Sequence, residues 1–248
     1  MPLIKNGPVT IHYEEAGQGF PLLVLPGGGL NSTIKGLADH AFNPLEAFSD
    51  TYRVITLDIR NANDGHSEGP LDIERTWDAF TDDQLALLER LGIDNFMVLG
   101  FCIGGPMIWN LIKRAVDRVA AAILVHPSGF ISSHPNVFVD LNTQGWAPGF
   151  MKHHPDITKA MIAEYLDNMY TKRADFVFTV DRDYVRNCQT PVLILPDDIP
   201  PHPYLTAMET ALLAPNAQVS LYPWKENDRK IALALNHIRN FMAVNTPG

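Results

Sequence analysis

The segment FMVLGFCIGG, residues 96–105, decides the fold of this chain. Its first four residues form a continuous apolar run, which is typical of a buried strand, and apolar residues at 107, 111 and 115 then recur at helical spacing. Between them lies Gly100-Phe101-Cys102-Ile103-Gly104, and a side chain can stand on such a tight turn only where small residues flank it. The segment therefore predicts a strand, a sharp turn carrying Cys102, and a helix.

Strands and helices alternate over the rest of the 248 residues, with no internal repeat. We expect strands at 9–15, 21–25, 52–57, 96–99, 119–125, 191–195 and 218–222, and helices at 73–91, from 104 onward and at 229–242. Strands separated by helices at this rhythm form a parallel sheet that is covered on both faces. The sequence therefore predicts a single α/β domain, residues 1–248, with a mostly parallel sheet.

One region, 130–186, departs from this alternation. It contains aromatic residues, prolines and a helical stretch near 160–169, but no apolar run typical of a strand. Excursions of this length in compact domains are usually lids or binding segments. We predict a small helical cap inserted before the penultimate strand. The alternative is a peripheral helical decoration that does not contact a substrate.

The pattern G-x-C-x-G between a buried strand and a helix resembles the nucleophile elbow of the α/β-hydrolase family, with cysteine where serine is usual. The resemblance extends over nearly the whole chain and implies the α/β-hydrolase fold. Dienelactone hydrolases of this family also have a cysteine there, although the surrounding sequence is not especially similar to theirs. A thiol at a helix N-terminus has a lowered pKa, which favours a nucleophile; the alternative is that Cys102 is a small buried apolar residue.

Acyl transfer also needs backbone N–H donors directed at the developing oxyanion. Ile103, directly after the nucleophile position, supplies one donor. Resemblance to the family's HGxG-type turn implies that Gly28, within Pro26-Gly27-Gly28-Gly29, supplies the other, with Pro26 in place of the usual histidine. A purely structural glycine turn is the alternative.

The family's catalytic acid follows the strand that corresponds to 191–195, where this sequence has two adjacent aspartates, Asp197 and Asp198. The family's G-x-x-D spacing favours Asp198 and leaves Asp197 as the alternative. Either carboxylate could instead cap or brace the proline-rich loop. A second family loop, D-x-R-G-x-G-x-S, is resembled in a longer form by residues 58–67, where we expect Asp58 and Arg60 to brace the loop through hydrogen bonds.

The family's histidine is missing from its usual late position. Counting back from Phe241-Met242 leads to Trp224-Lys225, and residues 222–227 contain no histidine. His202 and His126 are the substitutes, because both are expected at the carboxyl edge of the sheet, where the sites of open α/β folds gather. Prolines on both sides of His202 stiffen its placement, so it is the first candidate for the base and His126 is the second.

Charge, composition and motifs exclude several classes of partner. The net charge is −9, from 19 Lys and Arg against 28 Asp and Glu, and no basic block is present, so we expect no nucleic acid partner. The adjacent His153-His154 lack a spaced carboxylate or cysteine, so we expect no metal, and nothing implies a cofactor. Residues 1–7 lack the apolar part of a secretory signal, and the longest apolar run, 119–125, is too short to span a bilayer. We therefore expect a cytoplasmic protein with no membrane partner and no Cys102–Cys188 disulfide; its oligomeric state is unknown.

These residues together predict a cysteine-nucleophile hydrolase of a small carbonyl substrate: an ester, a thioester, a lactone or an activated C–C bond. Cys102 attacks the carbonyl to form an acyl-enzyme, the N–H groups of Gly28 and Ile103 hold the oxyanion, and His202 with Asp198 moves protons. The missing late histidine favours an alternative of another class: a non-hydrolytic small-molecule binder, or a lyase, with the same fold.

Overall fold

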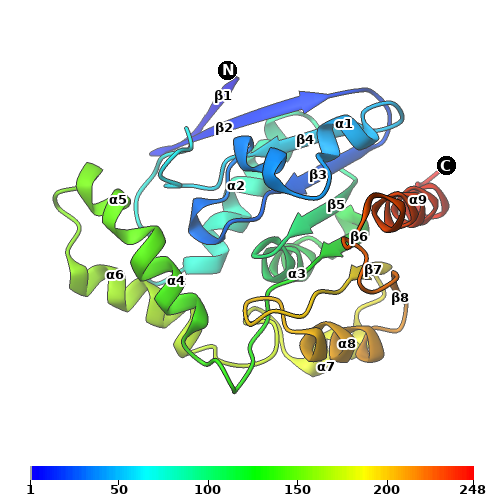
Figure 1. Cartoon of the computed structure of the whole chain (residues 1–248). Helices are drawn as coiled ribbons and strands as arrows, with labels where there is room; N and C mark the ends of the chain where they lie inside the picture. The colour runs from blue at the N-terminus through cyan, green and yellow to red at the C-terminus, as the bar shows by residue number, and fades with distance from the viewer. Residues whose placement is uncertain (1) are drawn as a thin grey trace.

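A computed structural model describes residues 2–248 (Figure 1). Its strands form one eight-stranded sheet in the order β1-β2-β4-β3-β5-β6-β7-β8. The strands are β1 (Leu3–Asn6), β2 (Val9–Ala16), β3 (Pro21–Leu25), β4 (Arg53–Leu57), β5 (Phe96–Phe101), β6 (Val119–Val125), β7 (Val192–Leu195) and β8 (Ala217–Val219). Strands β1 and β2 pair antiparallel, β2 also runs antiparallel to β4, and all other pairs are parallel. The predicted α/β fold with a mostly parallel sheet is confirmed.

Two strands differ from the sequence prediction. Strand β1 was not expected, because three of its four residues are exposed and it has no apolar run. The predicted strand at 218–222 is corrected to β8, residues Ala217–Val219. Its partner β7 has only four residues, and the ladder between them pairs Val192 with Ala217, Leu193 with Gln218 and Ile194 with Val219, so the pairing ends at Val219.

Helices cover both faces of the sheet, as predicted. They are α1 (Pro44–Phe48), α2 (Thr76–Arg90), α3 (Gly104–Arg114), α4 (Val137–Gly145), α5 (Ala147–His153), α6 (Lys159–Leu166), α7 (Arg182–Asn187), α8 (Tyr204–Leu213) and α9 (Asp228–Asn245). One apolar core joins the sheet to α2, α3 and α8, and a second joins the opposite face to α1 and α9. On β5, Val98 belongs to the first core, while Met97 and Leu99 belong to the second. This alternation explains why the central strands read as continuous apolar runs.

Between β6 and β7 the chain makes the long excursion that the sequence predicts as a cap. Helices α4, α5 and α6 lie together at one side of the molecule, away from the sheet, whereas α7 lies beside α8 (Figure 1). The Nε1–H of Trp77 in α2 donates to the carbonyl of Met169 at 3.0 Å, and the Nε1–H of Trp146 donates to that of Asn61 at 2.8 Å. The Arg182 guanidinium binds the Glu209 carboxylate of α8. The predicted range therefore includes α4–α6, whose buried apolar residues join the core of the body, and a final helix, α7, that packs beside α8.

No helix within residues 2–248 combines the length and the apolar character needed to cross a membrane.

Candidate active site

Cys102 stands at the turn between β5 and α3 with a φ of 52°, in the left-handed region. A Cβ on Gly100 would lie 2.9 Å from the backbone of Gly104, so only glycine fits at that side of the turn. Hydrogen bonds pin the strained residue: its N–H donates to the carbonyl of Val125 at 3.1 Å, and its own carbonyl accepts from the N–H of Ser128 at 2.9 Å. A non-glycine residue persists in this conformation only where its surroundings enforce it, as they do here.

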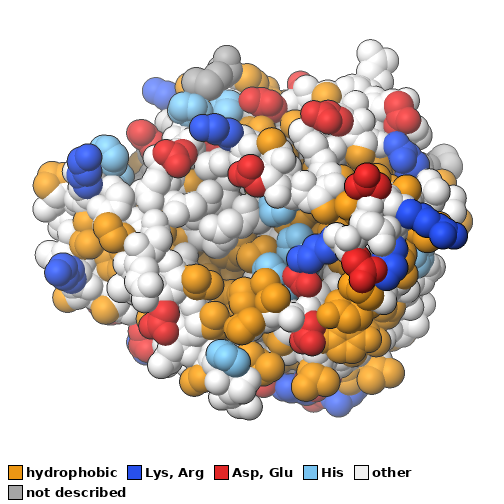
Figure 2. Space-filling view, viewed as in Figure 1, with side chains coloured by type: hydrophobic (Ala, Val, Ile, Leu, Met, Phe, Trp, Pro, Cys, Tyr) orange, Lys and Arg blue, Asp and Glu red, His pale blue; other side chains and the backbone are white. Residues whose placement is uncertain are grey.

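The thiol of Cys102 is partly exposed, and its Sγ lies 3.4 Å from Oγ of Ser128. Cys188, by contrast, is buried in the core on the side of α7. Figure 2 shows histidine side chains at the floor of a central hollow, with a group of hydrophobic side chains along one margin. Cys102 is therefore partly exposed at the margin of the core, whereas Cys188 is enclosed by it.

The glycine turn that follows β3 approaches the elbow closely. A Cβ on Gly27 would lie 2.9 Å from the Cβ of Phe101 and 3.2 Å from the Cβ of Cys102. Gly28 has a φ of 134°, and its N–H is directed at Sγ of Cys102, where it stabilises a thiolate. Ile103 lies at the start of α3, where backbone N–H groups have no partner within the helix. Gly28 therefore lies beside the sulfur, and Ile103 directly follows Cys102 at the start of α3.

His202 and Asp197 come from one loop, after β7. The backbones of Ile199 and His202 pair in an isolated antiparallel bridge, which turns the chain back on itself. This turn brings Nδ1 of His202 to 3.3 Å from Oδ2 of Asp197. Asp197 is buried, whereas Asp198, which the sequence favours as the acid, is exposed to solvent. The structure therefore brings His202 together with Asp197, the sequence's alternative, and not with Asp198.

Cys102 and His202 alter one another's acidity. Burial alone would raise the pKa of the Cys102 thiol, but hydrogen bonding and charge from the His202 imidazole, with smaller contributions from Ser128 and Gly28, lower it to about 6. Burial likewise opposes the charged form of His202, but Asp197 and Cys102 raise its pKa to about 9. Both shifts favour the charged forms of the two groups, the thiolate of Cys102 and the imidazolium of His202.

The Nε2 atom of His202 forms no hydrogen bond of ordinary length and angle, although the ring lies near enough to Sγ of Cys102 for the two groups to interact. Catalytic hydrogen bonds commonly tighten only when substrate is bound. Nε2 is therefore the nitrogen that remains for proton exchange at the sulfur, because Nδ1 faces Asp197.

His126, the second candidate for the base, ends β6 and is 6% exposed. Its ring centroid lies 4.8 Å from that of His202 and 5.9 Å from that of Trp224, on which it stacks. Burial, followed by the charges of His202 and Lys225, holds the pKa of His126 well below its ordinary value. His126 is therefore an uncharged residue that packs against the His202 ring.

Three residues of the site were missed by the sequence analysis: Ser128, whose Oγ lies 3.4 Å from Sγ of Cys102, and also His40 and Lys225. His40 stacks on Phe101 with ring centroids 4.3 Å apart, and burial lowers its pKa. It directly follows a short 3-10 helix, Lys35–Asp39, in the segment after β3, and the signal available in the sequence was that this segment leaves the same carboxyl edge of the sheet as Cys102. Lys225 occupies the place where the family's histidine was sought, and its Nζ lies 2.5 Å from Oδ2 of Asp197.

The loop after β4 is braced as expected. The Asp58 carboxylate pairs with Nδ1 of His12 at 2.7 Å and accepts the N–H groups of Ile34 and His66, each at 2.8 Å. Arg60 forms a two-pronged ion pair with Asp83. These contacts tie the loop to β2, to the segment after β3 and to α2, which is the bracing role expected of Asp58 and Arg60.

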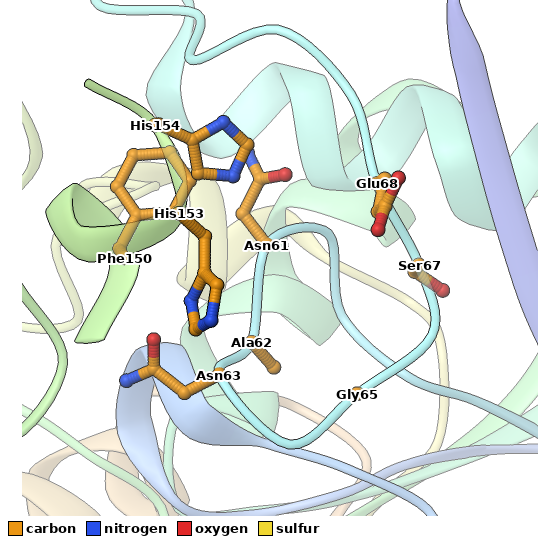
Figure 3. A pocket seen from close by; sticks show the side chains of 9 residues that line it. All are labelled: Asn61, Ala62, Asn63, Gly65, Ser67, Glu68, Phe150, His153 and His154. Atoms are coloured by element: carbon orange, nitrogen blue, oxygen red, sulfur yellow. The ribbon is translucent and has the colours of Figure 1, made fainter. Parts of the chain in front are cut away.

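A separate cavity of about 200 Å³ lies between this loop and α5. Figure 3 shows the His153 ring of α5 pointing toward Asn63 and Ala62 of the loop, while the Phe150 ring lies beside His154. Neither Cys102 nor His202 lines it, so it is not the reaction site. His153 and His154 have no third ligand, and among residues 2–248 no group of three or more His, Cys, Asp or Glu side chains is arranged to hold a metal ion.

Comparison with known proteins agrees with this geometry. A family model described as the alpha/beta hydrolase fold matches residues 21–210, which is more than half of the chain. The chain belongs to the α/β-hydrolase family. The match runs from β3 to α8 and thus contains the glycine turn, the elbow, and the loop of Asp197 and His202.

Individual relatives of this α/β hydrolase are distant. Carboxylesterase YbfK of Bacillus subtilis is 27% identical over 194 residues, which make up 71% of this chain and 62% of the esterase. The 2-hydroxy-6-oxo-6-phenylhexa-2,4-dienoate hydrolase of Comamonas testosteroni is 30% identical over 50% of this chain and 42% of its own length. The chain thus spans less than two thirds of these curated relatives.

Solved structures share the fold over the whole chain. A meta-cleavage product hydrolase from Pseudomonas fluorescens IP01 superposes with a TM-score of 0.73 at 14% identity, covering 99% of this chain and 98% of the other. The enol-lactonase from Burkholderia xenovorans LB400 gives a TM-score of 0.65 at 18% identity, covering 98% and 100%. At these identities the likeness establishes the fold alone.

Proposed function

We propose that this α/β hydrolase is a cysteine-dependent hydrolase of small carbonyl compounds, with Cys102 as nucleophile, His202 as acid and base, and Asp197 as the residue that orients His202. The observation that carries the proposal is the partly exposed Cys102 beside His202, where a thiol pKa of about 6 is paired with a His202 pKa of about 9. A purely structural cysteine does not need an ionised pair of this kind.

The reaction follows from these positions. The thiolate of Cys102 attacks the substrate carbonyl carbon, and the carbonyl oxygen becomes an oxyanion that accepts hydrogen bonds from the N–H groups of Gly28 and Ile103. As the tetrahedral intermediate collapses, Nε2 of His202 gives its proton to the leaving oxygen, sulfur or carbon. A thioester between Cys102 and the acyl group remains.

The second half of the reaction regenerates the enzyme. Neutral His202 removes a proton from a water molecule, whose oxygen attacks the thioester carbonyl at the same oxyanion site. The thioester C–S bond breaks, the acid product leaves, and Cys102 returns as the thiolate beside protonated His202. Asp197 stays ionised throughout and stabilises the imidazolium, as its position 3.3 Å from Nδ1 allows.

The substrate class follows from this chemistry and from the relatives. The relatives are named as a carboxylesterase, a hydrolase of 2-hydroxy-6-oxo-6-phenylhexa-2,4-dienoate and a meta-cleavage product hydrolase. A resting thiolate is best suited to activated carbonyl groups such as thioesters, aryl esters and strained or enol lactones. A thiolate is itself a good leaving group, so the tetrahedral intermediate expels Cys102 again unless the leaving group of the substrate departs as easily.

The test is hydrolysis of a panel of p-nitrophenyl esters, acyl thioesters and enol lactones by the wild-type protein and by the Cys102→Ala variant. We expect the variant to lose turnover, and intact-protein mass spectrometry of the wild type to show an added acyl group that is absent from the variant. Matching turnover by the Cys102→Ala variant would overturn the proposal. Binding of these compounds without turnover or adduct would favour the non-hydrolytic binder instead.

A further inference from the structure

Lys225 brings a positive charge to the site that the sequence analysis did not predict. It lies in the loop between β8 and α9, and its Nζ is 2.5 Å from Oδ2 of Asp197. Nδ1 of His202 approaches the same oxygen at 3.3 Å. Two cationic groups therefore share one carboxylate oxygen, and Lys225 makes the shorter contact.

The backbone of Lys225 is held in place by its neighbour. Trp224 is completely buried, belongs to the core beside α9, and stacks on His126 with an angle of 9° between the rings. The side chain of Lys225 is 39% exposed, whereas that of Asp197 is 10% exposed. The loop at 222–227, where the family's histidine was sought, thus places the Lys225 ammonium group on the solvent-facing side of the buried Asp197 carboxylate.

A permanent cation on the shared oxygen has two physical effects. It keeps Asp197 ionised and fixed, since burial alone would raise the pKa of Asp197 whereas His202 and Lys225 lower it well below its usual range. It also withdraws negative charge from the His202 imidazolium and repels it. The titratable groups around His202 are Asp197, Cys102, His126, His40 and Lys225. His126 and His40 have lowered pKa values and remain neutral.

We propose that Lys225 is a positioning residue: it anchors Asp197 through the shared Oδ2 atom and thereby weakens His202 as a base to the strength that proton return to a leaving group requires. This inference rests on the proposed function, in which His202 must both protect the Cys102 thiolate and release its proton. Without Lys225, His202 would hold its proton more tightly and return it more slowly.

The experiment replaces Lys225 by Met, by Gln and by Arg, with Lys230→Met as a matched control that removes a neighbouring cation paired with Glu226. The His202 titration is followed by NMR of histidine-labelled protein and assigned with the His202→Gln variant. Iodoacetamide alkylation of Cys102 is measured against pH in the same proteins. Neither measurement needs a substrate.

We expect Lys225→Met and Lys225→Gln to raise the midpoint of the His202 titration by about one pH unit, which is the size of effect that one nearby charge exerts. Lys225→Arg and Lys230→Met are expected to leave it unchanged. With substrate, the neutral variants should lower kcat more than they change KM, and they should move the alkaline limb of the pH profile upward.

The outcomes separate the two proposals. If the wild type shows no acidic Cys102 thiol in the alkylation profile, the proposed function fails and the role of Lys225 fails with it. If the wild type shows the acidic thiol but both neutral variants give the wild-type His202 titration and the wild-type pH profile, only the role of Lys225 is overturned. Variants that titrate normally but lose stability would likewise assign Lys225 to the fold alone.

Discussion

A cysteine at the nucleophile turn needs less from its histidine than a serine does. A serine hydroxyl must lose its proton during attack, so its histidine has to be aligned with it for that step. Cys102, with a pKa of about 6, is ionised beforehand at pH 7. In the proposed mechanism His202 stabilises the thiolate, returns a proton to the leaving group and later deprotonates water, and an imidazole from the loop of the acid can do all three. The lack of a histidine at 222–227 is therefore compatible with a working site.

The alkylation rate of Cys102 and the value of kcat/KM should both depend on pH. Because only the thiolate reacts, alkylation of Cys102 by iodoacetamide should accelerate as pH rises through about 6, well below the 9.0 of an ordinary thiol. The value of kcat/KM should rise through the same pH and fall above about 9, where His202 loses the proton that the leaving group needs. A Cys188→Ser background removes the second thiol. A single rise near pH 9 in both measurements would contradict the ion pair.

The second prediction separates the two adjacent aspartates. Asp197→Asn should reduce kcat by about 10²–10⁴-fold, because an amide neither stabilises the His202 imidazolium nor holds the same ring tautomer. Asp198→Asn is the matched control: its carboxylate is exposed, so kcat should stay within about twofold of the wild type. The measurement is steady-state turnover of one substrate by both variants. The reverse ranking would return the acid's role to Asp198.

At the scale of the element, the strand, turn and helix around Cys102 depend on close approach by the glycine turn after β3. Gly27→Ala would place a Cβ 2.9 Å from both Cε1 of His40 and the Cβ of Phe101, so the turn must move away from the sulfur. Since displaced oxyanion donors cost about 10²–10³ in kcat, we expect a loss in that range with little change in KM.

The control for this variant is Gly145→Ala at the end of α4, where an added Cβ meets nothing within 4 Å. Both variants should fold, as judged by circular dichroism, and only Gly27→Ala should lose activity. Wild-type kcat in Gly27→Ala would show that the turn does not contribute to the oxyanion site.

Local elements could be predicted from the sequence, whereas contacts between loops could not. The β5–turn–α3 unit is local: an apolar run, two glycines and a helical period specify it, so it was predicted. The choice between Asp197 and Asp198 was not available, because neighbouring side chains in extended chain point to opposite sides and the loop's turn at Ile199 and His202 decides which one faces inward. His40 was missed because the segment after β3 that carries it has no period to read. The contact of Lys225 joins two loops 28 residues apart in sequence, which no local pattern records.

At the scale of the whole molecule, the helices α4–α6 are joined to the body by a shared apolar core and by several side-chain hydrogen bonds. Trp146, at the junction of α4 and α5, is 2% exposed, donates its Nε1–H to the carbonyl of Asn61 and stacks on Phe150 at 4.8 Å. Leu30 donates its backbone N–H to Oδ1 of Asn142 in α4. Because Leu30 follows the glycine turn closely, the position of these helices is coupled to the turn that carries Gly28.

Trp146→Phe tests this coupling, because phenylalanine keeps the stacked ring and removes only the N–H donor. The unpaired carbonyl of Asn61 should lower the free energy of unfolding by about 1–3 kcal/mol in urea titrations. If α4–α6 act as a cap, KM should rise while the pKa of Cys102, read from its alkylation, stays at about 6, since the elbow itself is untouched. Leu141→Ala, on the exposed side of α4, should change neither stability nor KM. A Trp146→Phe protein that is destabilised but has an unchanged KM for every substrate of the panel would make these helices a structural decoration, because a segment that encloses the substrate cannot loosen without weakening the complex.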